Sequence, residues 1–307
     1  MKTLSKSNRD IMALSFVPGL GAQKIINLLE KAKDTEEIFR MKEEDFRQVL
    51  GRSFSSFKRI TEAREDREFI SELEYIEKEG IRIVSYCDEC YPEGLRHIYD
   101  PPVLLYYKGN LKKADNESIA IVGSRDASFY GCKMAESLAS CLAERGVTIV
   151  SGMARGIDSA AHKGALKVRG RTIAVMGSSF RYIYPRESRE LFRAICEEGA
   201  VVTEYPSGIK AAKWTFPKRN RIISGMAKGV VVAEAAKKSG AMITVDYALE
   251  EGREVFAVPA RADASGKCGS NFLIQNGAKL VMNADDVLQE LNIKGLKGNK
   301  LEEKILI

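Results

Sequence analysis

The chain has 307 residues, of which 45% are hydrophobic and 29% charged, enough apolar material for one or two folded domains and too much for a disordered chain. Only 8 prolines and 25 glycines exclude collagen-like and low-complexity classes, and no apolar run approaches the length of a membrane span. The start, MKTLSKSNRD, lacks the apolar segment of a signal peptide, and 6 cysteines are few for this length, so we expect a soluble protein of the reducing cytoplasm.

The formal charge of +6 is concentrated in one part of the chain. Residues 119–230 carry 18 basic and 9 acidic side chains, whereas the segments on either side are each nearly neutral. A local excess of positive charge attracts polyanions and phosphates, which makes them the leading class of partner. A solvated basic face is the alternative.

Residues 1–75 show helical spacing of apolar side chains and little strand character. The sequence VPGLGAQKI at 17–25 places a Pro-Gly-Leu-Gly turn between two expected helices, the pattern of a helix-hairpin-helix. Such a turn either presents backbone amides to a phosphate or belongs to a protein-interaction module, and the near-neutral charge favours the module. We predict a small helical domain over residues 1–80.

A second domain is predicted over residues 81–291. Its segment 91–110 holds a Pro-Pro turn and the strand-like VLLYYKG, and short apolar runs then alternate with stretches of helical spacing. The apolar runs are 119–122, 147–150, 172–176, 200–204, 229–234, 254–258 and 279–282; the expected helices are 130–145, 158–169, 187–198 and 239–251. This alternation predicts an α/β fold with a doubly wound, mostly parallel sheet, whose ligand lies beyond the carboxyl ends of the strands.

The first two of these strands end in glycine-rich turns with arginines. Gly123, Ser124 and Arg125 form a predicted phosphate grip, without the spacing of a dinucleotide fingerprint. In the second turn, Ser151, Gly152, Arg155 and Gly156 precede a helix and provide a second arginine for an anion. We expect Asp158 to cap that helix and His162 to hydrogen-bond Asp158.

The next two turns carry aromatic residues. Tyr182, Tyr184 and Pro185 are interpreted as packing and turn residues. In the fourth turn, Trp214 and Phe216 lie among basic residues, including Lys218, Arg219 and Arg221, a mixture that suits single-stranded nucleic acid because bases stack on rings while cations neutralise phosphates. We expect this segment to be a binding loop; the alternative is that Phe216 and Pro217 only fix the loop before a helix.

The fifth strand ends at Glu234, and Ser239, Gly240 and Thr244 begin the following helix, where amides and hydroxyls complete an anion site. Glu234 alone, without a partner acid, nucleophile or metal cluster, makes no active site. The chain lacks a Walker A sequence, and the pair Cys87 and Cys90 has no second pair for zinc. We therefore expect a non-enzymatic binder with no cofactor and no metal.

Taken together, these motifs resemble the DNA-processing protein A (DprA/Smf) family. The matching elements include IAIVGSR, IVSGMARGIDSAAHKGAL, FPKRNRIISG, SGAMIT, REVFAVP and GSNFLIQNGA, in order over about residues 81–283. The resemblance implies an extended Rossmann-like fold that binds single-stranded DNA, a SAM-like or helix-hairpin-helix domain before it, a homodimer, and loading of the RecA recombinase onto incoming strands in natural transformation. It places the DNA site at Gly123, Ser124, Arg125, Ser151, Gly152, Arg155, Gly156, Phe216, Lys218, Arg219, Arg221, Ser239, Gly240 and Thr244.

The sequence departs from the family pattern at Gly177-Ser178-Ser179, at Pro259-Ala260 and in the short segment 292–307, where we expect a tail and no winged-helix domain. Two other functions stay open. One is a Rossmann enzyme resembling nucleoside monophosphate hydrolases, although their P-G-G-x-G-T loop is replaced here by AAKKSGAMIT. The other is a structural protein whose basic segment binds an acidic protein face.

Overall fold

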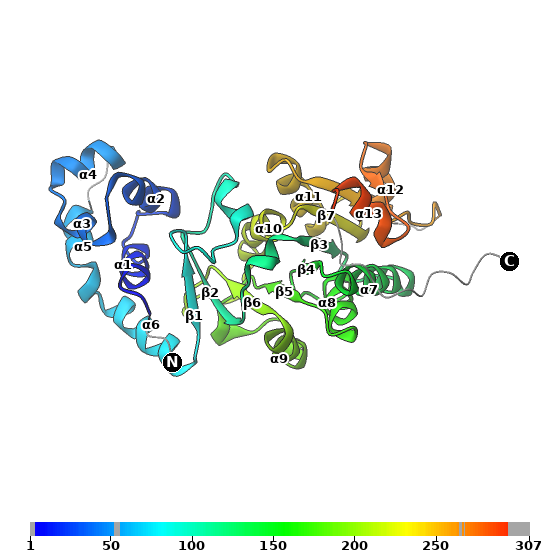
Figure 1. Cartoon of the computed structure of the whole chain (residues 1–307), viewed down its shortest axis with the longest axis horizontal. Helices are drawn as coiled ribbons and strands as arrows, with labels where there is room; N and C mark the ends of the chain where they lie inside the picture. Colours follow the sequence, from blue (N-terminus) through cyan, green and yellow to red (C-terminus); the bar gives the residue numbers. More distant parts are fainter. Residues whose placement is uncertain (1–3, 52–55, 264–265, 267, 294–307) are drawn as a thin grey trace.

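A computed structural model describes residues 4–51, 56–263, 266 and 268–293, and within these ranges nine strands form one sheet (Figure 1). The strands are β1 (Arg82–Ser85), β2 (Leu104–Gly109), β3 (Ser118–Gly123), β4 (Thr148–Ser151), β5 (Thr172–Val175), β6 (Ala200–Thr203), β7 (Gly229–Glu234), β8 (Glu254–Ala257) and β9 (Lys279–Leu280). Their order across the sheet is β1-β2-β6-β5-β4-β3-β7-β8-β9. Strand β2 runs antiparallel to both of its neighbours, and all other pairs are parallel.

Helices precede the sheet and connect its strands. Before the sheet lie α1 (Lys6–Ser15), α2 (Ala22–Lys31), α3 (Thr35–Arg40), α4 (Glu43–Leu50), α5 (Phe57–Thr61) and α6 (Arg67–Lys78). Between and after the strands lie α7 (Phe129–Glu144), α8 (Ile157–Lys167), α9 (Arg189–Glu198), α10 (Thr215–Met226), α11 (Gly240–Glu250), α12 (Gly269–Gln275) and α13 (Ala284–Glu290).

The predicted doubly wound, mostly parallel sheet is confirmed. Side chains along the buried strands alternate between two apolar layers, as the period of two requires. Ile119 and Ile121 of β3 pack on the face covered by α7 and α8, whereas Ala120 and Val122 pack on the face covered by α10 and α11. Both faces are therefore covered, which explains why the parallel strands are apolar throughout.

One predicted element is wrong. The segment around Phe216, expected to be a loop, forms the helix α10. Pro217 is its third residue, where a proline is tolerated because the first amides of a helix have no acceptor within it. Strand β1, which the sequence did not predict, pairs antiparallel with β2.

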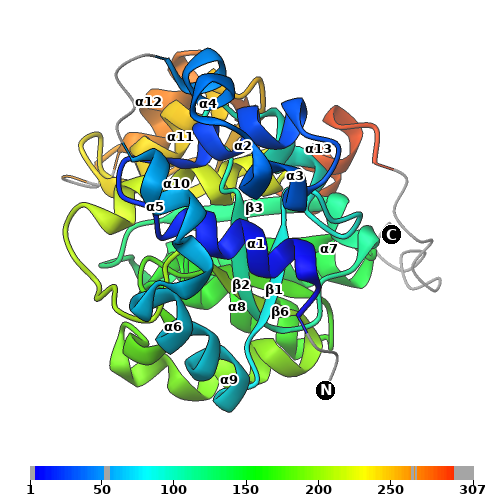
Figure 2. The same cartoon turned by 90° about the vertical axis from the view of Figure 1, so that its left-hand side faces the viewer.

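The helices α1 to α6 lie beside the β1–β2 edge of the sheet, at the left of Figure 1, and Figure 2 shows α1 lying across β1. Their apolar side chains join those of β1, β2, β5, β6 and α9 in one continuous cluster. Asp66 begins α6 by accepting hydrogen bonds from the backbone N–H groups of Glu68 and Phe69. The turn predicted at 17–25 does connect α1 to α2. The helical part thus packs directly on the sheet.

The chain after α13 is described only to Ile293, so the predicted tail at 292–307 lies almost entirely outside the described residues. Among the helices described, none combines the length and the apolar character needed to cross a bilayer.

Candidate functional site

A cavity of about 740 Å³ lies beyond the carboxyl ends of β3 and β7. Strand β3 pairs with β4 on one side and with β7 on the other, so the connections leaving β3 and β7 run in opposite directions along the sheet. Such a reversal leaves a crevice where open α/β sheets bind their ligands. The cavity is lined by residues of the segments after β3, β4, β5 and β7, of α8, of the segment before α10, and of α10 and α11.

The turn after β3 is held tightly. The Ser124 N–H donates to the carbonyl oxygen of Glu234 at 2.7 Å, and the Ser124 carbonyl accepts from the N–H of Ile157 at 3.2 Å. A Cβ on Gly123 would lie 2.5 Å from the Ile157 side chain and 2.6 Å from the Glu234 carbonyl, so only glycine fits between these neighbours. The backbone that carries Arg125 is thereby fixed at the cavity.

Arg125 is exposed at the cavity and forms no ion pair with any described residue. Its guanidinium carbon lies 4.9 Å from the centre of the Phe216 ring. A cation over an aromatic face is stabilised there while its N–H groups stay available. Arg125 is therefore a donor that can reach an anion in the cavity.

Arg219, a buried residue that lines the cavity, supplies a second positive charge. Its side chain is buried, and Nη1 donates to the carbonyl oxygens of Gly152, at 2.8 Å, and of Val175, at the ends of β4 and β5. Burial lowers the pKa of Arg219 to about 10, while the nearby Asp158 carboxylate opposes this shift. The guanidinium consequently keeps its charge at neutral pH.

An aromatic wall faces these cations. The rings of Tyr184 and Phe216 lie 5.6 Å apart, and both residues line the cavity. Tyr184, which the sequence analysis interpreted as a packing residue, is 49% exposed. Trp214 follows the lining residue Lys213 and is 57% exposed, with its ring edge-on to Tyr205. These rings offer stacking surfaces beside the charges.

Helix α11 closes the other side of the cavity. Its first residue, Gly240, and the preceding Ser239 line the cavity, with Thr244 one turn further on. Among the described residues, the buried Ser239 hydroxyl has no hydrogen-bond partner. Asn220 holds this end in place by donating to the Gly240 carbonyl at 3.1 Å. The amino terminus of a helix attracts anions through its free amides and its dipole.

The structure thus brings together eight of the predicted site residues. Those that line the cavity are Gly123, Ser124, Arg125, Phe216, Arg219, Ser239, Gly240 and Thr244. The remaining six, Ser151, Gly152, Arg155, Gly156, Lys218 and Arg221, do not line it.

Three of those six support the turns from beneath. The Ser151 hydroxyl donates to the Ile121 carbonyl at 2.6 Å, and the Gly152 carbonyl accepts from Arg219. Gly156 has a φ of +72°, and a Cβ there would lie 2.2 Å from the Ser124 carbonyl oxygen. These residues fix the two turns against each other.

The other three are cations directed elsewhere. Arg155 is exposed and forms an ion pair with Glu187, and Lys218 is exposed on α10. Arg221 is buried, donating from Nε to Asp100 at 3.0 Å and from Nη2 to Glu204 at 2.6 Å. Residues two apart on a helix point about 200° apart, which explains why Arg219 reaches the cavity and Arg221 does not.

The expected roles of Asp158 and His162 are wrong in detail. Gly156 occupies the N-cap of α8, and Asp158, inside the first turn, accepts from the Ala154 N–H at 3.3 Å. The buried His162 ring contacts Thr172, with Nδ1 and Oγ1 2.7 Å apart. The Thr172 hydroxyl donates to the Ile149 carbonyl, so Nδ1 carries the ring proton, and no described residue bonds to Nε2.

This environment predicts a pH dependence of stability. Burial, and then the charge of Arg219, lowers the pKa of His162 to about 3, below its ordinary 6.5. Between pH 6.5 and 3, His162 is protonated in the unfolded chain and neutral in the folded chain. The free energy of unfolding therefore falls as pH drops below 6.5, by roughly 1.4 kcal/mol per pH unit for this group. Chemical denaturation between pH 7 and 4.5 should show a shallower decline for His162→Gln than for the unmodified chain; parallel declines would contradict this account.

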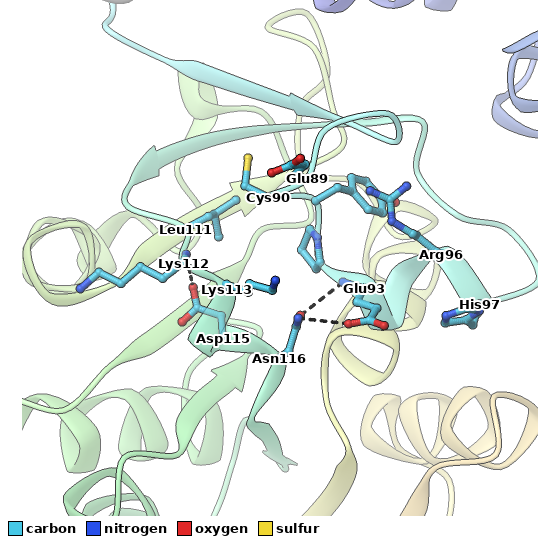
Figure 3. Close-up of a pocket in the computed structure, with 12 residues that line it drawn as sticks. Glu89, Cys90, Glu93, Arg96, His97, Leu111, Lys112, Lys113, Asp115 and Asn116 are labelled. Carbon is cyan, nitrogen blue, oxygen red and sulfur yellow. Dashed lines mark hydrogen bonds between the residues drawn. The ribbon is translucent and has the colours of Figure 1, made fainter.

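A second cavity, of about 530 Å³, lies between residues 89–97 and residues 111–116 (Figure 3). Several of its polar groups are bonded to the protein itself. Asp115 accepts from the Lys112 N–H at 2.7 Å, and the Asn116 amide contacts both the N–H and the carboxylate of Glu93. Within the described ranges, no three His, Cys, Asp or Glu side chains group as metal ligands would. We assign no ligand to this cavity.

A family model, a curated relative and a solved structure all indicate the same protein family. The family model described as DNA recombination-mediator protein A matches residues 82–292. The DNA processing protein DprA of Streptococcus pneumoniae is 47% identical over 206 residues, which cover 67% of this chain and 73% of that protein. The crystal structure of DNA processing protein A from S. pneumoniae superposes with a TM-score of 0.78 and 38% identity, covering 94% of this chain and 98% of that one.

A further solved structure is that of DNA processing protein A from Helicobacter pylori, whose title describes its single-stranded DNA binding mode. It superposes with a TM-score of 0.62 and 28% identity, covering 70% of this chain and 97% of that one.

Proposed function

The chain belongs to the DNA recombination-mediator protein A family, and from this premise we propose that it binds single-stranded DNA in the cavity beyond β3 and β7. One observation carries the proposal: an arginine without an ion pair among the described residues, two aromatic rings and a helix amino terminus converge on a single cavity. In this arrangement Arg125 and the first amides of α11 contact phosphates, while bases stack on Phe216 and Tyr184.

The proposal extends to the biological role. The family name and the S. pneumoniae relative support a function in DNA processing and recombination. We propose that the protein acts in the cytoplasm as a homodimer that loads the RecA recombinase onto incoming single strands during natural transformation. A strand-exchange assay with a strand coated by single-strand binding protein tests this role, since a mediator should shorten the lag before exchange.

The competing hypothesis is an enzyme that hydrolyses nucleoside monophosphates. Glu234, the carboxylate at the end of β7, accepts from the backbone N–H of Ser128 at 2.8 Å and from its hydroxyl. It therefore acts as an anchor for the start of α7, which supports a binding function over a catalytic one. Incubation with nucleoside monophosphates separates the two functions: the proposal expects no free base, and steady release of base would favour the enzyme.

Binding through phosphates predicts a strong salt dependence. When the logarithm of the association constant is plotted against the logarithm of the salt concentration, each phosphate that the protein neutralises contributes about −0.7 to the slope for single-stranded DNA. A strand that meets Arg125 and Lys213, the two exposed cations among the described residues that line this cavity, should therefore give a slope of about −1.4. Fluorescence anisotropy with labelled oligothymidine from 50 to 400 mM salt measures this slope, and affinity that does not change with salt would contradict a phosphate-based site.

A further inference from the structure

One wall of the cavity is an irregular segment, residues 204–214, which connects β6 to α10. Ala211, Ala212 and Lys213 of this segment line the cavity, and Trp214 follows them. The ends of the segment are fixed, since Glu204 pairs with Arg221 and the Tyr205 hydroxyl donates to the Thr215 carbonyl at 3.2 Å. The turn that holds Lys213 and Trp214 is closed by hydrogen bonds between Ala212 and Thr215, one of them from the Ala212 N–H to Thr215 Oγ1 at 3.1 Å. The contacts in the middle of the segment, around Ser207, fix the rest of it.

The middle of the segment is held by a carboxylate from the helical part of the chain. The backbone N–H of Ser207 lies 2.9 Å from Oε1 and 3.0 Å from Oε2 of Glu72, and the Ser207 hydroxyl also donates to Oε2. Glu72 belongs to α6 and is only 4% exposed. No described cation forms an ion pair with it. Burial raises the pKa of Glu72, and the bonds from Ser207, followed by the charge of Arg181, act against that rise.

A buried carboxylate without an ion-pair partner is costly unless other interactions compensate. Among the described residues, the hydrogen-bond donors to Glu72 come from Ser207, and the charge of Arg181 adds to their effect. The contact therefore joins two parts of the chain 135 positions apart. Its loss would release residues 204–214 from α6.

The same helix also contacts the segment that carries Tyr184. Arg181 lies three residues before Tyr184 in the chain. Its guanidinium lies over the ring of Tyr75 of α6, 4.7 Å from the ring centre. Ser179 in turn binds residues 204–214, because its N–H donates to the Ile209 carbonyl at 3.0 Å and its hydroxyl donates to the Ser207 carbonyl at 2.9 Å. Helix α6 thus contacts two of the segments that carry cavity residues, at Ser207 and at Arg181.

We propose that Glu72 is a positioning residue, through which the helical N-terminal part holds residues 204–214 in the arrangement that binds DNA. The helical part then sets the affinity of the cavity without touching the strand. This inference rests on the proposed DNA binding, and it adds a function for α6 that acts through Ser207.

The experiment uses Trp214 as its reporter, because it is the one tryptophan in the sequence and it lies at the end of the segment. Glu72→Ala and Glu72→Gln are compared with Glu77→Gln, an exposed position on the same helix. We measure acrylamide quenching of Trp214 without DNA, and oligothymidine affinity at one salt concentration. For Glu72→Ala we expect altered quenching and three- to tenfold weaker binding, with smaller changes in the same direction for Glu72→Gln and none for Glu77→Gln.

The two readouts separate the possible failures. If the unmodified chain does not bind oligothymidine, the proposed function fails, while quenching still tests whether Glu72 positions the segment. If Glu72→Ala does not fold, Glu72→Gln, which keeps the side-chain size and one acceptor, is measured at a temperature well below its Tm. Quenching and affinity for both Glu72 variants equal to those of Glu77→Gln would overturn the inference.

Discussion

Replacing Arg125 with alanine is expected to weaken binding of oligothymidine by about 10- to 100-fold. The Arg125 guanidinium is exposed at the cavity and forms no ion pair with a described residue. Because it is already held over the Phe216 ring, little side-chain entropy is lost when its N–H groups bind a ligand. A charge-assisted hydrogen bond to phosphate contributes roughly 1.5 to 3 kcal/mol. The loss should be the same for all base sequences, because backbone contacts carry no base code.

The control for Arg125→Ala is Arg193→Ala, which removes an exposed arginine from α9 that does not line the cavity. Anisotropy titrations across a salt series should show the slope of log affinity against log salt becoming shallower by about 0.7 for Arg125→Ala. The Arg193 variant should keep the parent's slope. Equal affinities for the two variants would place the phosphate site elsewhere.

Replacing Arg219 with methionine is expected to lower the free energy of unfolding by roughly 3–5 kcal/mol. The change leaves the buried Asp158 carboxylate without its nearby positive charge, and it removes the donor to the carbonyls of Gly152 and Val175. Burial already raises the pKa of Asp158, and Arg219 is the largest influence that opposes this. Methionine fills a similar volume, so the loss reports charge and hydrogen bonds more than packing.

Denaturant unfolding at pH 7 measures that loss, with Arg219→Lys as the matched variant. Lysine keeps the charge but has no second donor to replace Nε, which bonds Asn220 Oδ1 at 3.1 Å, so the stability of the lysine variant should lie between those of the parent and the methionine variant. A change below about 1 kcal/mol for the methionine variant would show that Arg219 is not needed to balance Asp158.

Much of the site could be predicted from the sequence because it lies at strand ends. Gly123 to Arg125 follow one buried apolar run, and Ser239 and Gly240 follow another. Carboxyl ends of parallel strands meet at one edge of a sheet, so these residues were bound to be neighbours once the runs were identified as parallel strands.

The parts that escaped prediction depend on helical phase or on distant contacts. Interpreting residues around Phe216 as a loop gave no reason to separate Arg219 from Arg221, whereas their positions in α10 direct them to opposite sides. Tyr184 reaches the cavity by packing against Phe216, and Glu72 reaches Ser207 across 135 positions. No local pattern signals such contacts. The boundary between domains near residue 80 stays a prediction.

The most direct test of the account is a crystal structure of the chain with a short oligothymidine, in which the position of the strand is measured. We expect phosphates within hydrogen-bond distance of Arg125 and of the first amides of α11, and a base against the rings of Phe216 and Tyr184. A strand bound on another face, with the cavity beyond β3 and β7 left empty, would contradict the account.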